Sequence, residues 1–190
     1  DALDKEVASD IRFITAGHRS YSSCGQYKVN VADARKELAA RGLADVEVSF
    51  VGDWFAHEGL VLANAQSVAE ALSRLPEEKR AGARVVFTAH SIPNAMAATC
   101  AYEAQLAEAS RLVADAVGAG SFELVYQSRS GPPQVPWLGP DIVDHLPDVA
   151  ARGVSAVVVV PIGFLSDHVE VLWDLDEEAR EKAQTLGLGF

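Results

Sequence analysis

Short apolar runs rich in β-branched and aromatic residues recur along the chain, separated by longer segments with helical spacing. In segments 26–41, 59–75 and 95–117 apolar residues lie three and four positions apart, which predicts helices. Strands that alternate with helices form βαβ units and a mostly parallel sheet with both faces covered. The pattern therefore predicts an α/β fold, a Rossmann-like three-layer lobe whose sheet is flanked by helices. Its predicted strands are 11–16, 46–51, 84–89, 122–127 and 156–164.

Glycine and proline mark the boundaries of these elements. Gly42, Gly118 and Gly153 each follow a predicted helix, where glycine commonly ends the helical conformation. The segment SGPPQVPWLGP at 130–140 contains four prolines and two glycines. Its composition predicts a stiff loop between a strand and the next helix.

Charge and cysteine content narrow the class of protein. The net charge of −11 argues against a nucleic-acid partner, which normally selects a basic surface. The chain has two cysteines, Cys24 and Cys100, with neither a CxxC motif nor a disulfide framework, which favours a reducing compartment. The longest uncharged apolar run, 153–166, is too short to span a bilayer, and no signal peptide is visible. We expect a cytoplasmic protein without a transmembrane segment.

Polar residues stand just beyond the carboxyl end of each predicted strand, where open α/β sheets bind ligands. Helix caps explain part of this pattern, because Ser91 and Asp167 each precede a predicted helix. Caps do not explain His90 and Glu170, which lie far apart in the chain but are predicted to converge. These polar segments are 17–20, 53–55, 90–91, 128–130 and 167–170.

Glu170, Asp174 and Glu178 repeat at four-residue spacing after the last predicted strand. On a regular α-helix each successive carboxylate would drift by about 40° around the axis. A stretch of wider π-type winding would bring them nearly into line, and such winding is frequent at functional sites. A solvated helix face is the alternative explanation, and we prefer it for Asp176 and Glu177.

Three long motifs resemble the signature segments of ferrochelatases, enzymes that insert ferrous iron into porphyrins. They are FTAHSIP at 87–93, SGPPQVPWLGPD at 130–141 and PIGFLSDHVEVLWDLDEE at 161–178, and they occur in the family's order. The residues of these motifs are most similar to those of the actinobacterial branch of the family, whose members resemble coproporphyrin ferrochelatases. The resemblance implies a chelatase-like fold and an iron-inserting lyase of haem biosynthesis, with coproporphyrin III as the favoured porphyrin.

The resemblance also implies a division of the chain, because family members are longer and consist of two lobes of the same βαβ type. Residues 1–44 would carry the last strand and helix of the N-terminal lobe. Residues 45–190 would form the C-terminal chelatase lobe. Whether these residues catalyse the reaction by themselves is left open.

By the same resemblance, His90 faces the centre of the porphyrin and Glu170 is its partner carboxylate across the cleft. A neutral imidazole can accept a pyrrole proton near neutral pH and can also ligate iron, so both roles stay open for this pair. Asp174 and Glu178 would continue from Glu170 as an acidic track that guides hydrated ferrous iron, the metal substrate. The predicted metal-binding residues are therefore His90, Glu170, Asp174 and Glu178.

Binding the porphyrin requires flat apolar walls and partners for its propionate groups. Trp137, Phe164 and Trp173 could supply walls, although each could instead belong to the core. Four polar residues could bind propionates or line the same edge of the sheet, namely Ser128, Arg129, Ser130 and Arg19. Ordinary surface roles are the alternative. Surface or loop roles are expected for His18, His57 and His145, and an indirect role for His168.

Cys24 lies in SYSSC at 20–24, which resembles a segment of actinobacterial ferrochelatases, many of which carry a 2Fe–2S cluster. In those proteins one ligand comes from this cysteine and three come from a C-terminal tail. Cys24 and Cys100 cannot complete a set of four thiolates. We therefore expect a cluster only in a longer, full-length parent.

Two other functions stay open. A chelatase acting on sirohydrochlorin or on a cobalt-requiring corrin precursor would belong to the same superfamily. Such enzymes place two histidines at the metal and lack the proline loop, and here the second histidine near the site is His168. The other alternative is a lobe that binds a tetrapyrrole without catalysis. The sequence does not determine the oligomeric state.

Overall fold

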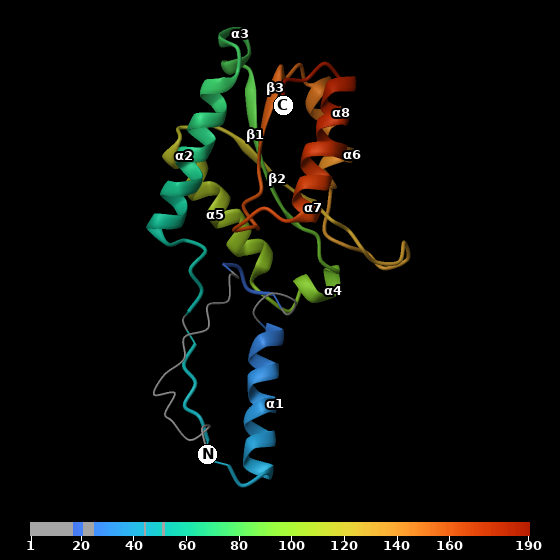
Figure 1. The fold of residues 1–190 in the computed structure, drawn as a ribbon. Coiled ribbons are helices and arrows are strands. Elements are labelled where there is room, and N and C mark those ends of the chain that lie inside the picture. Colours follow the sequence, from blue (N-terminus) through green and yellow to red (C-terminus); the bar gives the residue numbers. More distant parts are fainter. Residues whose placement is uncertain (1–16, 21–24, 44, 51) are drawn as a thin grey trace.

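A parallel three-stranded sheet lies at the centre of the computed structural model (Figure 1). Its strands are β1 (Ala83–His90), β2 (Phe122–Gln127) and β3 (Ala156–Val160), in the order β2-β1-β3. β1 pairs in parallel with both neighbours, as the βαβ pattern predicts. The α/β prediction is therefore confirmed. The structure describes residues 17–20, 25–43, 45–50 and 52–190, so the predicted strand 11–16 lies outside the described residues.

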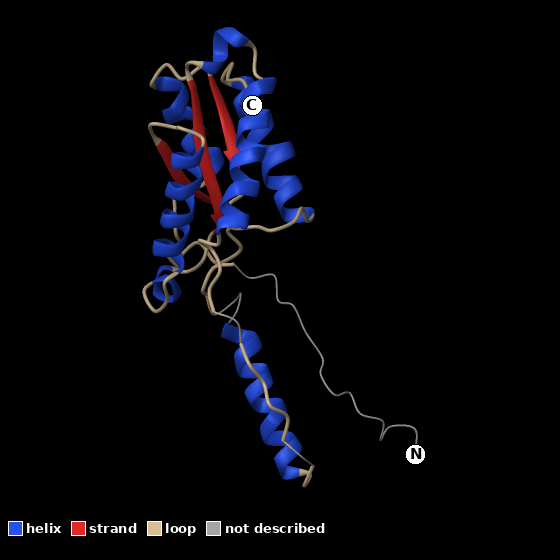
Figure 2. Cartoon of the chain, turned by 90° about the vertical axis from the view of Figure 1, so that its left-hand side faces the viewer, coloured by secondary structure: helices blue, strands red, loops and turns tan. Residues whose placement is uncertain are grey.

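Helices cover both faces of the sheet (Figure 2). On one face Phe87 of β1 belongs to the same buried cluster as Val68 of α2 and Leu106 of α5. On the other face its neighbour Val86 belongs to a cluster with Leu146 and Leu175. Successive strand residues point to opposite faces, so the middle of β1, Val85–Ala89, is buried on both faces and is apolar apart from Thr88. The helices are α1 (Gln26–Ala40), α2 (Glu58–Arg74), α3 (Glu77–Arg80), α4 (Asn94–Ala97), α5 (Tyr102–Ala116), α6 (Ile142–Ala151), α7 (Val169–Val171), the π-helix η2 (Leu172–Ala179) and α8 (Arg180–Thr185).

The structure corrects three element predictions. Residues 45–50, all of which it describes, form no strand, because no neighbouring strand pairs with them. The predicted helix 95–117 is broken into α4 and α5, where the Thr99 hydroxyl donates to the Met96 carbonyl at 2.8 Å and competes with helical bonding. β3 ends at Val160 rather than at residue 164, since Pro161 has no N–H for a ladder.

α1 stands apart from the helices that cover the sheet (Figures 1 and 2). None of its 15 residues, all within the described part, is buried. Its contacts with the following segment are polar or at the surface, such as the ion pair of Arg35 with Asp45 and Lys28 over the Phe50 ring. Isolated helices of about this length are marginally stable in water, so α1 lacks the packing that normally stabilises a helix. Among all described residues, no helix is long and apolar enough to cross a membrane.

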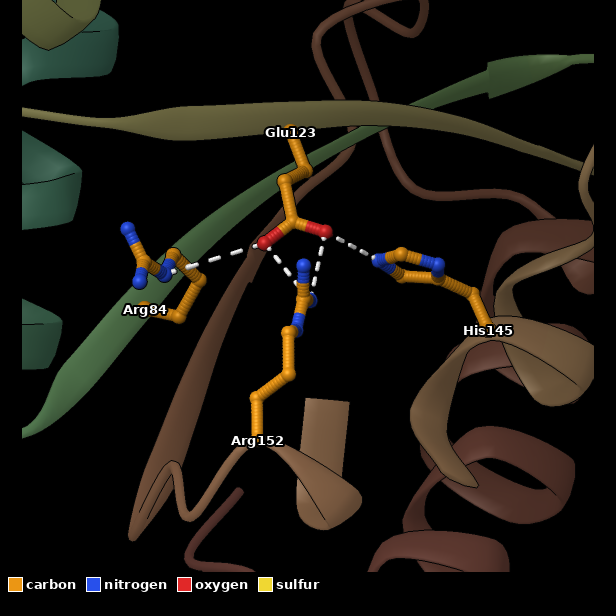
Figure 3. Close-up of polar contacts among 4 residues, drawn as sticks. All are labelled: Arg84, Glu123, His145 and Arg152. Carbon is orange, nitrogen blue, oxygen red and sulfur yellow. Dashed lines mark hydrogen bonds and ion pairs between the residues drawn. The ribbon is translucent and has the colours of Figure 1, made fainter. Parts of the chain in front are cut away.

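Glu123 joins α6 to the amino-terminal end of the sheet (Figure 3). Its carboxylate lies 2.6 Å from Nε2 of His145 and accepts hydrogen bonds from Nη2 of Arg152 at 2.8 and 2.9 Å. Nε of Arg84 lies 3.7 Å away. The surface or loop role expected for His145 is therefore wrong, because its side chain is only 12% exposed and pairs with Glu123.

Opposing effects act on the pKa of the Glu123 carboxyl. Partial burial acts to raise it, but the hydrogen bond from Arg152 and the charges of His145 and Arg152 outweigh burial. The pKa therefore lies below its ordinary value. Glu123 thus contributes stability above the ordinary carboxyl pKa, and this contribution is lost as the pH falls through the lowered folded-state pKa.

We expect Glu123→Gln to lower the free energy of unfolding by about 2 kcal/mol at neutral pH, because it weakens charge-assisted bonds in a half-buried cluster. Urea unfolding of both forms should show this difference constant above about pH 5 and shrinking as the pH falls from there to about pH 3. Glu37→Gln, which removes an exposed carboxylate paired with Arg41, is the matched control and should change the unfolding midpoint little. A difference between Glu123→Gln and the parent that is constant with pH would contradict this account.

Candidate functional site

His90 is the last residue of the central strand β1, and its geometry leaves one ring nitrogen available. Nδ1 lies 2.5 Å from the carbonyl oxygen of Ser91, which can only accept a hydrogen bond, so Nδ1 carries the proton. In the neutral ring Nε2 is then the acceptor, and it lies 3.9 Å from a carboxylate oxygen of Glu170. The structure thus brings His90 and Glu170 together from distant parts of the chain. Both are accessible, with side chains 33% and 61% exposed.

Two further contacts hold the end of β1. The buried hydroxyl of Tyr102 donates to the His90 carbonyl at 3.1 Å. Burial raises the pKa of Tyr102 far above its ordinary value, so the hydroxyl stays protonated as a donor. On the other side the backbone of Gly163 approaches β1, and its N–H donates to the Thr88 carbonyl at 3.2 Å. A Cβ at Gly163 would lie 2.7 Å from the Cβ of Ala89, so this approach requires glycine.

The proline loop is fastened to the segment that follows His90. The Ser91 hydroxyl donates to the Leu138 carbonyl at 2.7 Å, and the Asn94 N–H donates to the Pro136 carbonyl at 3.0 Å. Trp137 packs against Gly131, where a Cβ would lie 2.3 Å from the indole nitrogen. This nitrogen is buried and has no hydrogen-bond partner among the described residues. The loop is stiff in composition and also held in place.

The π-type winding expected for the acidic segment is present in η2, which contains Asp174 and Glu178. One Asp174 oxygen, Oδ2, accepts hydrogen bonds from the Ser128 hydroxyl and from the Gln127 amide, the latter at 3.3 Å. The Glu178 carboxylate accepts from the Trp173 indole at 3.0 Å. Asp174 is therefore directed inward to the end of β2, while Glu178 is held at the surface of the π-helix.

Asp176 has a different environment from the other acids of η2. It forms an ion pair with Arg180 at 2.7 Å, and both side chains are about half exposed. The arrangement fits the solvated helix face that we prefer for this residue.

Negative charge accumulates around the acidic segment. Asp141, whose side chain caps α6 by accepting from the Val143 N–H, has a raised pKa. Burial is the largest cause, followed in the same direction by the charges of Asp144, Asp174 and Glu178. Such a field favours a cation over an anion at this edge of the sheet.

The residues predicted to contact a porphyrin have other partners in this structure. The Arg129 guanidinium donates to loop carbonyls, among them Pro133 at 3.2 Å, and the Ser128 hydroxyl donates to Asp174. Arg19 pairs with Asp53 at 3.0 Å. Phe164 packs edge-on against the His168 ring at 5.1 Å. Ser130 and Trp173 are exposed at the same end of the sheet.

The sequence also assigns roles to His18, His57 and Cys24, and the structure describes the two histidines. His18 lies in a loop, as one of the two expected roles has it, but it is not at the surface: it is buried beside Phe55 and Tyr102, and burial lowers its pKa to about 4. The surface or loop role expected for His57 is confirmed: the residue is exposed in the loop before α2 and caps that helix by accepting from the Gly59 N–H. Cys24 lies outside the described residues.

Within the described part of the chain, no group of three or more His, Cys, Asp or Glu side chains is close enough to hold a metal ion. His90 and Glu170 form a pair, whereas Asp174 and Glu178 are each bound to other side chains. His90 can supply a proton acceptor. Glu170 on α7, and Asp174 and Glu178 on η2, can supply carboxylate ligands one after another along these helical segments.

Comparisons with known proteins give a consistent result. The family model described as ferrochelatase matches residues 1–190. Coproporphyrin III ferrochelatase of Nocardia farcinica is 49% identical over 97% of this chain and 54% of its own length. The proteins of that name from Mycolicibacterium vanbaalenii and Streptomyces griseus are 48% and 46% identical, over 94% and 92% of this chain and 52% and 50% of their own lengths. The chain spans about half the length of these curated relatives.

We expect Gly163→Ala to destabilise the fold by about 1–3 kcal/mol, since the added methyl group collides with the backbone of β1 next to His90. Urea unfolding measures the loss. Gly120→Ala is the matched control, because no described atom lies within 4 Å of its Cβ and its φ is not in the left-handed range. Equal stability of the two variants would show that the approach of Gly163 to β1 is not constrained.

Proposed function

Because the chain belongs to the ferrochelatase family, we propose that the protein inserts ferrous iron into a porphyrin, coproporphyrin III, in haem biosynthesis. The relatives that carry this name support the proposal. So does one feature of the site, the acceptor nitrogen of His90, which faces Glu170 at 3.9 Å beyond the end of the central strand. We propose His90 and Glu170 as the catalytic residues.

Metal insertion requires that two pyrrole protons leave the macrocycle. The Ser91 carbonyl keeps the proton of His90 on Nδ1, so Nε2 can accept a pyrrole proton. The imidazolium that forms would be stabilised by the negative charge of Glu170. Since Glu170 is largely exposed, it can pass the proton on to solvent. In its neutral form His90 can instead ligate the iron through Nε2, so proton acceptance and iron ligation are alternative roles for this nitrogen.

The acids of η2 suit the delivery of the metal. Ferrous iron arrives hydrated, and carboxylate oxygens can hold its water shell without trapping the ion. In our proposal Glu178, at the surface, meets the ion first, and Asp174 and Glu170 lead it toward His90.

The porphyrin would lie against the edge formed by the proline loop and the start of the last helical segment. Trp137 and Phe164 are the proposed apolar walls, and Trp173 is a third. Ser128 and Arg129 are the proposed propionate partners. Both would have to exchange their present hydrogen bonds, to Asp174 and to loop carbonyls, for a propionate. Arg129 is exposed and can do so at little cost.

We also propose that the chain contributes to two lobes, with residues 1–44 in one and residues 45–190 in the other. Two observations support this division. α1 has no buried residue within the described part, and the chain spans about half the length of its relatives. A second lobe would cover α1 and close the porphyrin cleft over His90. A 2Fe–2S cluster with Cys24 as one ligand belongs to the same proposal and requires further thiolates. We place the protein in the cytoplasm.

A metal-insertion assay on the full-length protein, with coproporphyrin III and Fe²⁺ or Zn²⁺, tests the proposal. We expect insertion, and we expect His90→Ala to lower kcat by a factor of about 100 or more, because the proton acceptor is lost. His57→Asn is the matched control, since asparagine can also cap the helix and position 57 lies outside the site.

Insertion that survives His90→Ala would remove His90 from the mechanism. Activity on sirohydrochlorin without activity on coproporphyrin III would assign the protein to the neighbouring chelatases. Binding of the porphyrin without any insertion would leave a non-catalytic tetrapyrrole-binding protein.

A further inference from the structure

Gln127 is a polar side chain at a position that the fold could fill with an apolar one. It is the last residue of β2, is 0% exposed and is among the largest fully buried side chains. Its Oε1 atom is buried and has no hydrogen-bond partner among the described residues. An unsatisfied buried acceptor costs about 1–3 kcal/mol, whereas an apolar side chain of similar shape would cost nothing of this kind. The stability of the fold therefore does not explain why an amide side chain occupies this position.

The other end of the same amide has a partner in the candidate site. Nε2 donates to Oδ2 of Asp174 at 3.3 Å, and the Ser128 hydroxyl donates to the same oxygen. Ser128 has a φ of 59°, in the left-handed region that a residue with a side chain seldom adopts. The donors of Gln127 and Ser128 thus converge on Oδ2 of Asp174. The Ser128 donor is held there by an unfavourable backbone conformation.

The main chain of Gln127 is tied to the segment that carries His90. Gln127 is the register partner of His90 in the pairing of β1 with β2. Its carbonyl oxygen also accepts a hydrogen bond from the Ser91 N–H at 2.8 Å. One buried residue therefore contacts the His90 segment through its backbone and the π-helix through its side chain.

We propose that Gln127 is a positioning residue that fixes the Asp174 carboxylate, and with it the π-helix, relative to His90. Ser128 supplies the second donor. This inference rests on the proposed function insofar as Asp174 is taken to meet the metal substrate. Residues that orient a metal ligand through hydrogen bonds typically change metal affinity about 10–100-fold when they are replaced. Gln127 should therefore affect the metal and leave the porphyrin largely unaffected.

Calorimetric titration of the full-length protein with Zn²⁺, without porphyrin, tests the inference independently of insertion activity. Gln127→Met keeps the size of the side chain and removes the donor, and we expect it to weaken Zn²⁺ binding about 10-fold. Asp174→Asn should also weaken binding. Adding Gln127→Met to Asp174→Asn should weaken it no further, because the amide acts through the carboxylate.

A purely structural role would not give this pattern. Ser110→Ala is the matched control, since Ser110 is fully buried, lies on α5 and has a hydroxyl without a partner among the described residues. It should leave the Zn²⁺ affinity within about 2-fold. If Gln127→Met does not fold, Ser128→Ala removes the other donor, and we expect a loss of Zn²⁺ affinity in the same direction.

Three results would overturn the inference. The first is wild-type Zn²⁺ affinity in Gln127→Met, and the second is an undiminished effect of Gln127→Met in the Asp174→Asn background. The third is absence of Zn²⁺ binding by the unaltered protein. Insertion into coproporphyrin III by the unaltered protein is measured separately, so failure of the proposed function is distinguishable from failure of this inference.

Discussion

The pairing of β1 on both sides is the constraint on which the rest of the structure depends. Because β1 lies between β2 and β3, its backbone is fixed along its length, and it is buried from Val85 to Ala89, with Thr88 the one polar side chain in that stretch. His90, the last residue of the strand, is the first one after this stretch that is partly exposed. At this end of the strand His90 is in register with Gln127 of β2, the backbone of Gly163 lies against Ala89, and Glu170 faces the His90 ring. The candidate site thus forms where the sheet ends, with Glu170 and Asp174 added from the helical segments that follow β3.

The sequence predicted the sheet well where both faces are buried and poorly where a segment has no neighbour. Val157 and Val158 pack into different clusters, so a continuous apolar run was a sound sign of a strand. Of the predicted strand 46–51, the described residues 46–50 have a similar composition, but a strand also needs a neighbouring strand to pair with, which composition does not reveal. The break between α4 and α5 depends on the bonding of Thr99 to Met96, a local competition that apolar spacing does not register.

The candidate site could be predicted in part because its acids have a period. Glu170, Asp174 and Glu178 repeat at a spacing that calls for π-type winding, and η2 has it. Gln127 and Tyr102 were missed, because a single polar residue at the end of a strand or the start of a helix has no pattern. The buried His18 and the His145–Glu123 pair were missed for the same reason, since burial depends on neighbours that are distant in sequence.

The most direct test is to identify the side chains that ligate a metal ion at this edge of the sheet. X-ray absorption spectroscopy of the full-length protein loaded with one equivalent of Co²⁺ would identify them. We expect one imidazole nitrogen, from His90, with carboxylate or water oxygens as the remaining ligands, and loss of the imidazole contribution in His90→Ala. Two imidazole nitrogens, or a spectrum unchanged in His90→Ala, would contradict this expectation.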